Sequence, residues 1–157
     1  MRKFALWLLH LDLSLWFGAG IYFSLMAAEE LGRLPLNQFA AAVGLLFPPL
    51  FTLMAVTAIV GWVLYAWLGS QSRIVSRSFR AGHIVFLIGV LAALANRLVL
   101  LPLLQHVERQ MGSFLNATAA QQAQFGMMHG MSLLVHFVGM LMALLAWLCL
   151  TLNLRME

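Results

Sequence analysis

The sequence predicts an all-α integral membrane protein, built as an antiparallel bundle of four transmembrane helices. Three observations point to this class. Of the 157 residues, 63% are hydrophobic and only 9% are charged, whereas about a quarter of the residues are charged in a typical soluble domain. The mean hydropathy is +0.94, and a chain this small cannot bury so much apolar surface in a core of its own. Four apolar stretches are each long enough to cross a bilayer, which takes about 20 residues.

The remaining composition excludes other classes. The net charge is +4 and the pI is about 10.2, but the nine basic residues form no dense cluster, so nucleic-acid binding is not indicated. The one cysteine, Cys149, cannot support an internal disulfide framework. A soluble enzyme and a disordered chain are excluded by the hydropathy.

The first span is expected over residues 4–28. Arg2 and Lys3 precede it, as in a signal peptide, but the apolar run is longer than the 7–15 residues or so of a signal's hydrophobic region. It also contains His10 and Asp12. We therefore interpret it as a helix that is retained.

The other spans are expected over residues 44–68, 81–104 and 127–152, within a single domain of residues 1–157. Pro48 and Pro49 are placed in the first turn of the second helix, where proline is tolerated. Pro102 is expected to end or kink the third helix. The loop from His106 to Gly126 is expected to form an amphipathic surface helix. Short connections favour an up-down-up-down bundle.

The basic residues predict the orientation of the chain. They are concentrated at both termini and between the second and third spans, at Arg2, Lys3, Arg73, Arg77, Arg80 and Arg155. The positive-inside rule then places both termini in the cytoplasm, which agrees with an even number of spans. We expect a multi-pass protein of a bacterial inner membrane, with the lipid bilayer as its main partner.

Histidines within the spans are the strongest functional signal, because an ionisable residue inside a membrane usually has a role. By helical rise, His10 and His83 lie at similar depths near the cytoplasmic side. His129 opens the fourth helix, and His136 lies two turns deeper on the same face. Ser132, Gly139 and Met140 share that face.

These histidines favour ligation of haem b, because haem in a helical bundle is held by inward histidines on facing helices. His10 and His83 are the first candidates for axial ligands, followed by His136 and His129. Arg97 and Arg80 are candidates to pair with the haem propionates. The corresponding function is electron transfer or peroxide chemistry. The simpler alternative is that each histidine hydrogen-bonds to a neighbouring helix, for example to Ser14 or Asn96.

Two other functions stay open at this stage. Met127, Met128 and Met131 surround His129, and soft sulfur ligands select Cu(I), although methionine is also a common packing residue. A non-catalytic membrane scaffold is the third possibility. Self-association is expected through the small residues Gly18, Gly130 and Gly139. Asp12 points away from His10 and is expected either to meet Arg97 or to face an inner cavity.

Several short motifs are similar to those of a known family. They are Leu9-His10 with Trp16-x-Gly18, Leu46-Phe47-Pro48, Asn96 with Pro102, and His129-Gly130-x-Ser132. With these motifs the chain resembles the uncharacterised bacterial four-helix membrane family related to eukaryotic transmembrane protein 205. Its architecture is also similar, more loosely, to the membrane domain of copper-resistance D-type proteins. The resemblance implies four helices and no particular reaction. His136 stands where the first family often has asparagine, which points to an additional ligand in this chain.

Overall fold

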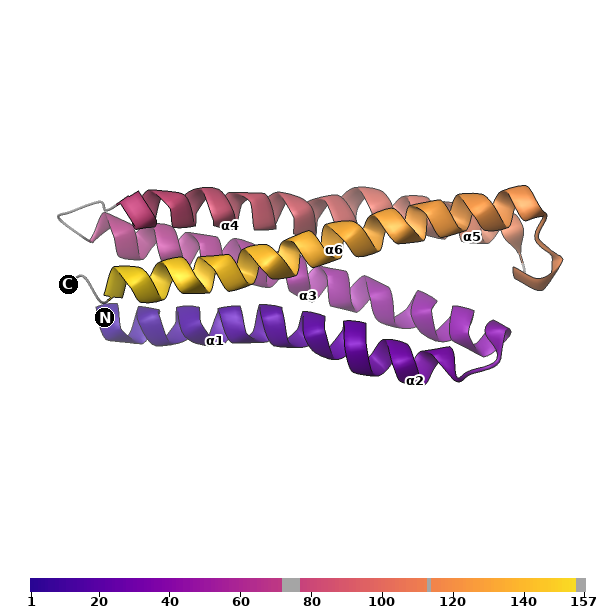
Figure 1. Cartoon of the computed structure of the whole chain (residues 1–157), viewed down its shortest axis with the longest axis horizontal. Coiled ribbons are helices and arrows are strands. Elements are labelled where there is room, and N and C mark those ends of the chain that lie inside the picture. Colours follow the sequence, from indigo (N-terminus) through magenta and orange to yellow (C-terminus); the bar gives the residue numbers. More distant parts are fainter. Residues whose placement is uncertain (72–76, 113, 155–157) are drawn as a thin grey trace.

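The protein is a bundle of four long helical rods (Figure 1). The structure is a computed structural model that describes residues 1–71, 77–112 and 114–154, and within these ranges it contains helices and turns but no strand. The all-helical class and the four spans predicted from the sequence are therefore confirmed. Each rod is long and apolar enough to cross a membrane.

The first rod consists of α1 (Arg2–Ile21), a π-helix η1 (Tyr22–Ala27) and α2 (Ala28–Gly32). The second rod is α3 (Leu36–Ser70). The third consists of α4 (Arg77–Ala95), a second π-helix η2 (Asn96–Leu100) and α5 (Leu101–Met111). A 3-10 turn, η3 (Phe114–Asn116), precedes the fourth rod, α6 (Ala119–Leu154).

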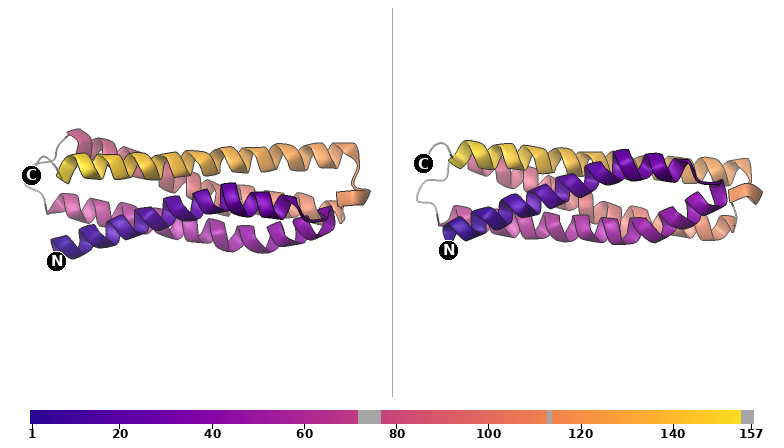
Figure 2. Two further views of the ribbon diagram at one scale, coloured as in Figure 1. Left: turned by 60° about the horizontal axis from the view of Figure 1, so that its bottom comes forward. Right: turned by 90° about the horizontal axis from the view of Figure 1, so that it is seen from below.

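The start of α1 and the end of α6 lie at one end of the bundle, here called the terminal end (Figures 1 and 2). The turns after Gly32 and Met111 lie at the other, distal end. Rods that are consecutive in the sequence run in opposite directions, as predicted. Arg73 and Arg155, which contributed to the orientation argument, lie outside the described residues.

The helices extend well beyond the spans predicted from hydropathy. With 35 and 36 residues, α3 and α6 are each about 50 Å long at about 1.5 Å per residue, whereas the hydrocarbon core of a bilayer is about 30 Å thick. Much of the predicted surface loop from His106 to Gly126 therefore belongs to α5 and α6, and the chain turns at Gly112, where φ is 64°.

The three helical prolines depart in part from the prediction, in which Pro48 and Pro49 lie in a first turn and Pro102 ends or kinks the third helix. Because α3 begins at Leu36, Pro48 and Pro49 are inside the helix and not in its first turn. Pro102 does not end the third rod, which continues to Met111. A proline cannot donate to the carbonyl four residues earlier and clashes with it. Here the π-helix η2 ends at Leu100, two residues before Pro102, and widens the turn that contains this carbonyl.

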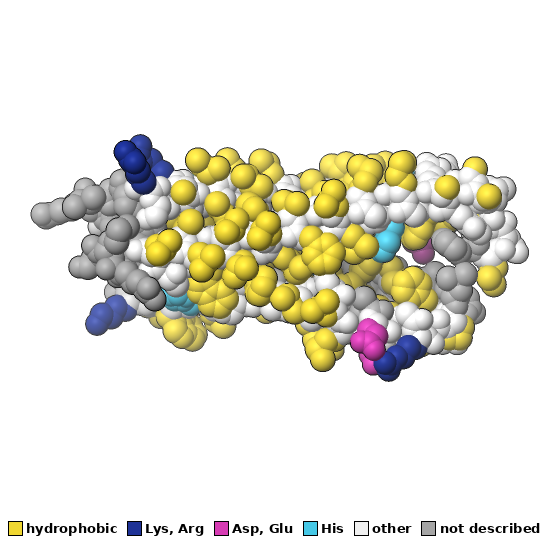
Figure 3. Space-filling view, viewed as in Figure 1, with side chains coloured by type: hydrophobic (Ala, Val, Ile, Leu, Met, Phe, Trp, Pro, Cys, Tyr) yellow, Lys and Arg dark blue, Asp and Glu magenta, His cyan; other side chains and the backbone are white. Residues whose placement is uncertain are grey.

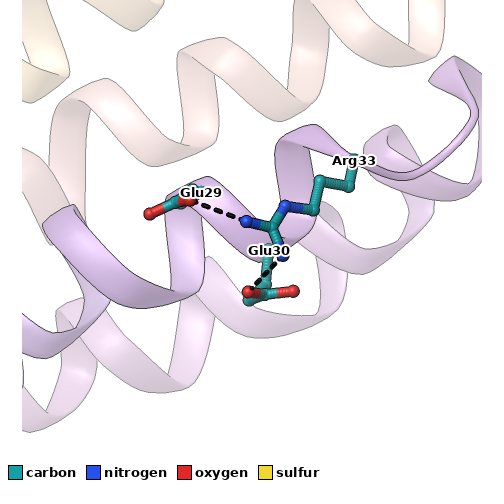
Figure 4. Close-up of polar contacts among 3 residues, drawn as sticks. All are labelled: Glu29, Glu30 and Arg33. Carbon is teal, nitrogen blue, oxygen red and sulfur yellow. Dashed lines mark hydrogen bonds and ion pairs between the residues drawn. The ribbon is translucent and has the colours of Figure 1, made fainter.

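The surface is apolar over the middle of the molecule. Figure 3 shows hydrophobic side chains across the visible face, with most of its charged side chains toward the two ends. At the distal end of the first rod, Arg33 lies between two carboxylates, 2.7 Å from Glu29 and 2.8 Å from Glu30 (Figure 4). All three side chains are well exposed, so these ion pairs add little stability.

Candidate functional site

A buried pair of hydrogen bonds joins the third and fourth rods. The amide of Asn96 donates to the backbone carbonyl of Ser132 (3.0 Å), and the hydroxyl of Ser132 donates to Oδ1 of Asn96 (2.8 Å). Both residues are only 2% exposed. The side chain of Asn96 is thus held on both of its polar atoms, which fixes η2 against α6.

His136 lies one turn farther along α6, and its side chain contacts the first rod. It is 5% exposed, and each of the other four histidines is more exposed. Its Nε2 lies 3.2 Å from Oγ of Ser24, and its ring also hydrogen-bonds the backbone of Gly20. The ring of Phe51, on α3, lies 6.1 Å away.

A small cavity adjoins these side chains. Its volume is about 10 Å³, which is at the lower limit of the space that one buried water needs. Asn96 and His136 supply polar groups to a lining that is otherwise mostly apolar; the full set is Trp16, Phe51, Met54, Ala93, Asn96, Val135, His136 and Gly139. The indole Nε1 of Trp16 is buried, and no hydrogen-bond partner for it occurs among the described residues.

Each of the two π-helices contributes a polar side chain to this region. Ser24 belongs to η1 and Asn96 to η2. A π-helix is rare and is often found at a functional site, because it redirects a side chain locally. We therefore take the group formed by Ser24, Asn96, Ser132 and His136 as the candidate functional site, and call it the interior polar site.

Sequence reasoning found part of this site. It placed Ser132, His136 and Met140 on one face of the fourth helix, as observed, and it identified Asn96 as a polar residue within a span. It missed Gly20 and Ser24. The signal that was available is the spacing of four residues along the first rod, in Asp12, Trp16, Gly20 and Ser24, which puts side chains on one helical face.

The first candidate ligand, His10, is engaged by the fourth rod. The indole Nε1 of Trp147 donates to Nδ1 of His10 over 2.9 Å. In a neutral imidazole that accepts at Nδ1, the proton is on Nε2. Neither ring nitrogen then offers a free lone pair, so His10 could bind a metal only after Trp147 releases it.

His83, the second candidate, packs against two aromatic rings, one on α3 and one on the preceding turn of α4. It lies edge-on to Tyr65 at 5.2 Å and to Phe79 at 4.8 Å between ring centroids. His10 thus contacts α6, whereas His83 contacts α3 and its own helix, α4. No three His, Cys, Asp or Glu side chains in the described part of the chain lie close enough together to share a metal ion.

The remaining candidates lie toward the distal end. His129 is stacked between Phe47 (5.9 Å) and Phe125 (6.0 Å), and its Nδ1 is buried with no hydrogen-bond partner among the residues described. Of the three methionines considered with it as copper ligands, Met128 is partly buried, whereas Met127 and Met131 are 61% and 50% exposed. The structure therefore directs these two sulfur side chains out of the bundle.

The charged candidates do not meet one another. Arg97 donates from Nε to Oγ1 of Thr52 (2.8 Å), and Arg80 is exposed in the first turn of α4. Oδ2 of Asp12 is buried without a hydrogen-bond partner in the part of the chain that is described, and it lies against Gly61 on α3. Of the two expectations for Asp12, the pairing with Arg97 is thus not observed.

Comparison with known proteins gives one family. The model of a domain of unknown function, DUF4149, matches residues 11–113. No curated protein and no solved structure matches the chain. The match agrees with the expectation of a family without an established reaction, while the relation to transmembrane protein 205 and to copper-resistance D-type proteins stays a prediction.

Proposed function

This chain belongs to the DUF4149 family, whose description assigns no activity, and we propose that it is a multi-pass membrane protein that binds a metal centre through the interior histidine His136. The observation that carries the proposal is the position of His136. It is the most buried histidine, it is oriented from one side by Gly20, and it adjoins a cavity. Ligating histidines are commonly oriented in this way, with one nitrogen on a carbonyl and the other available to the metal.

Haem b, the group expected from the sequence, is one form of this proposal. The geometry favours a single metal ion over the larger haem group. A cavity of about 10 Å³ is far smaller than a pocket that holds a cofactor, which is usually about 300–1,000 Å³. A haem would thus require the rods to separate, whereas a single ion requires only that Ser24 release Nε2 of His136.

The test uses full-length protein purified in detergent from cells grown with ample haem and copper. We expect one metal centre per chain by elemental analysis, and its loss in His136→Ala. His106→Ala is the matched control, since His106 is exposed and paired with Gln110 on its own helix.

The absorption spectrum separates the forms of the proposal. A Soret band that is lost in His10→Ala and His83→Ala, but not in His136→Ala, would support haem at the positions expected from the sequence and contradict a centre at His136. A colourless, metal-free protein would contradict every metal-binding form and favour the non-catalytic scaffold.

A further inference from the structure

Two methionine side chains meet beside His136 at a point that the sequence did not single out. Met54, on α3, is 4% exposed and Met140, on α6, is 7% exposed. A Cβ atom added to Gly20 would lie 2.5 Å from Sδ of Met140 and 2.9 Å from Cε of Met54. The sulfur of Met140 and the terminal methyl group of Met54 thus fill the space that the missing side chain of Gly20 leaves.

His136 belongs to the same group of side chains. It precedes Met140 by one helical turn, so the two share a face of α6. Its ring hydrogen-bonds the backbone of Gly20, against which Met140 lies. Met54 and His136 also line the same cavity. The imidazole of His136 and the side chains of Met54 and Met140 therefore all lie beside Gly20 in the bundle interior.

The chemistry of these donors selects the ligand. Thioether sulfur is soft and favours Cu(I), whereas magnesium, calcium and manganese favour carboxylate and carbonyl oxygen. All three donors are neutral, so a monovalent ion would bring one positive charge into the low-dielectric interior, and a divalent ion would bring two at a greater desolvation cost. The ring of Phe51, which is 5% exposed and lies 6.1 Å from His136, lines the same cavity as His136 and Met54.

We propose that His136, Met54 and Met140 form a Cu(I) site beside Gly20. This site rests on the proposed function, because it uses His136 as the metal-binding histidine, and it adds the identity of the metal and the two sulfur ligands. It differs from the copper cluster considered from the sequence, which combined His129 with Met127, Met128 and Met131, and in which Met127 and Met131 are exposed.

The experiment titrates the detergent-purified full chain with Cu(I) alone, under anaerobic conditions and against a chromogenic Cu(I) chelator. We expect one Cu(I) per chain, with sulfur and nitrogen scatterers in the X-ray absorption spectrum. Met54→Leu and Met140→Leu nearly conserve side-chain volume, which cores tolerate best. Each should weaken binding by at least about tenfold, since even changes outside the direct ligands cost 10–100-fold in metal affinity.

The matched controls are Met127→Leu and Met131→Leu, which make the same change at exposed positions and should leave Cu(I) affinity unaltered. Size-exclusion profiles and thermal unfolding show whether each variant is folded. Lost Cu(I) binding in folded Met54→Leu and Met140→Leu, with both controls intact, supports the site.

The two proposals fail in different ways. If His136→Ala abolishes binding of haem or of another metal while Met54→Leu and Met140→Leu do not, the proposed function stands and the Cu(I) site is wrong. If Cu(I) binding depends on Met127 and Met131 instead, the interior site is also wrong. If no metal or haem binds under any of these conditions, both proposals are overturned.

Discussion

At the level of single residues, two glycines decide where buried polar and sulfur-bearing side chains can lie. Gly20 makes room for Met140 beside His136, and Gly61 makes room for Asp12. A sequence shows that a glycine is present in a helix, but it does not show which neighbouring side chain fills the space. This is why Asp12 was expected to meet Arg97 or a cavity, and why Met54 was not considered from the sequence.

The slot at Gly61 gives the first prediction. A Cβ atom there would lie 2.5 Å from Oδ2 of Asp12 and 3.0 Å from Cε1 of Phe86, so Gly61→Ala forces the carboxyl and the ring apart. We expect the free energy of unfolding to fall by about 1–3 kcal/mol, as for other overpacked cores. Thermal unfolding in detergent measures it.

Gly18→Ala is the control, since a Cβ atom there meets nothing within 4 Å, and alanine has the higher helix propensity. Equal stability of Gly61→Ala and the unsubstituted protein would show that Asp12 does not occupy the slot.

The hydrogen bonds between Asn96 and Ser132 give the second prediction. Ser132→Ala removes the donor to Oδ1 of Asn96, and Asn96→Ala removes the other partner. We expect the two substitutions to be non-additive, with a coupling free energy of about 0.6–2 kcal/mol, the range found for hydrogen bonds between membrane helices. A double-mutant cycle on unfolding measures the coupling, and strictly additive effects would contradict a direct bond.

At the level of elements, the four helices could be predicted and their orientation about their own axes could not. Hydropathy identified each rod because lipid demands a long apolar helix. Helical rise also predicted similar depths for His10 and His83, but depth does not determine which neighbour a side chain faces. The π-helices η1 and η2 add to this difficulty, since nothing in an apolar sequence marks the extra residue in a wide turn.

The contact between α1 and α6 gives the third prediction. Trp147→Phe and His10→Ala each break the hydrogen bond from the indole to Nδ1 of His10. We expect each to lower stability by about 0.5–1.5 kcal/mol, the net value of one hydrogen bond, and the double variant to lose less than the sum. Metal content should be unchanged in all three.

Unfolding curves and elemental analysis of the same samples check this prediction. Loss of a bound metal or haem in His10→Ala would instead show that His10 leaves Trp147 and becomes a ligand.

At the level of the whole molecule, the start of α1 and the end of α6 share one end of the bundle. The positive-inside rule gives the fourth prediction, that the terminal end is cytoplasmic. In a Cys149→Ala background, a cysteine at Gln71 marks the terminal end and a cysteine at Asn116 marks the distal end.

In intact cells, an impermeant thiol reagent should label Asn116→Cys and spare Gln71→Cys. Permeabilised cells serve as the control in which both are labelled. The reverse pattern in intact cells would invert the proposed orientation.

The two π-helices also have a consequence for how chains of this family can differ in length. A hydrogen bond that spans five residues encloses one residue more than the α-helical bond, so η1 and η2 each hold one residue that a regular rod does not need. Deleting a single codon within Tyr22–Ala27 or Asn96–Leu100 should restore ordinary helical turns while the flanking segments keep their faces. We therefore expect one-residue gaps to be tolerated at these two places, in chains that keep the four rods but lose the inward Ser24 or Asn96.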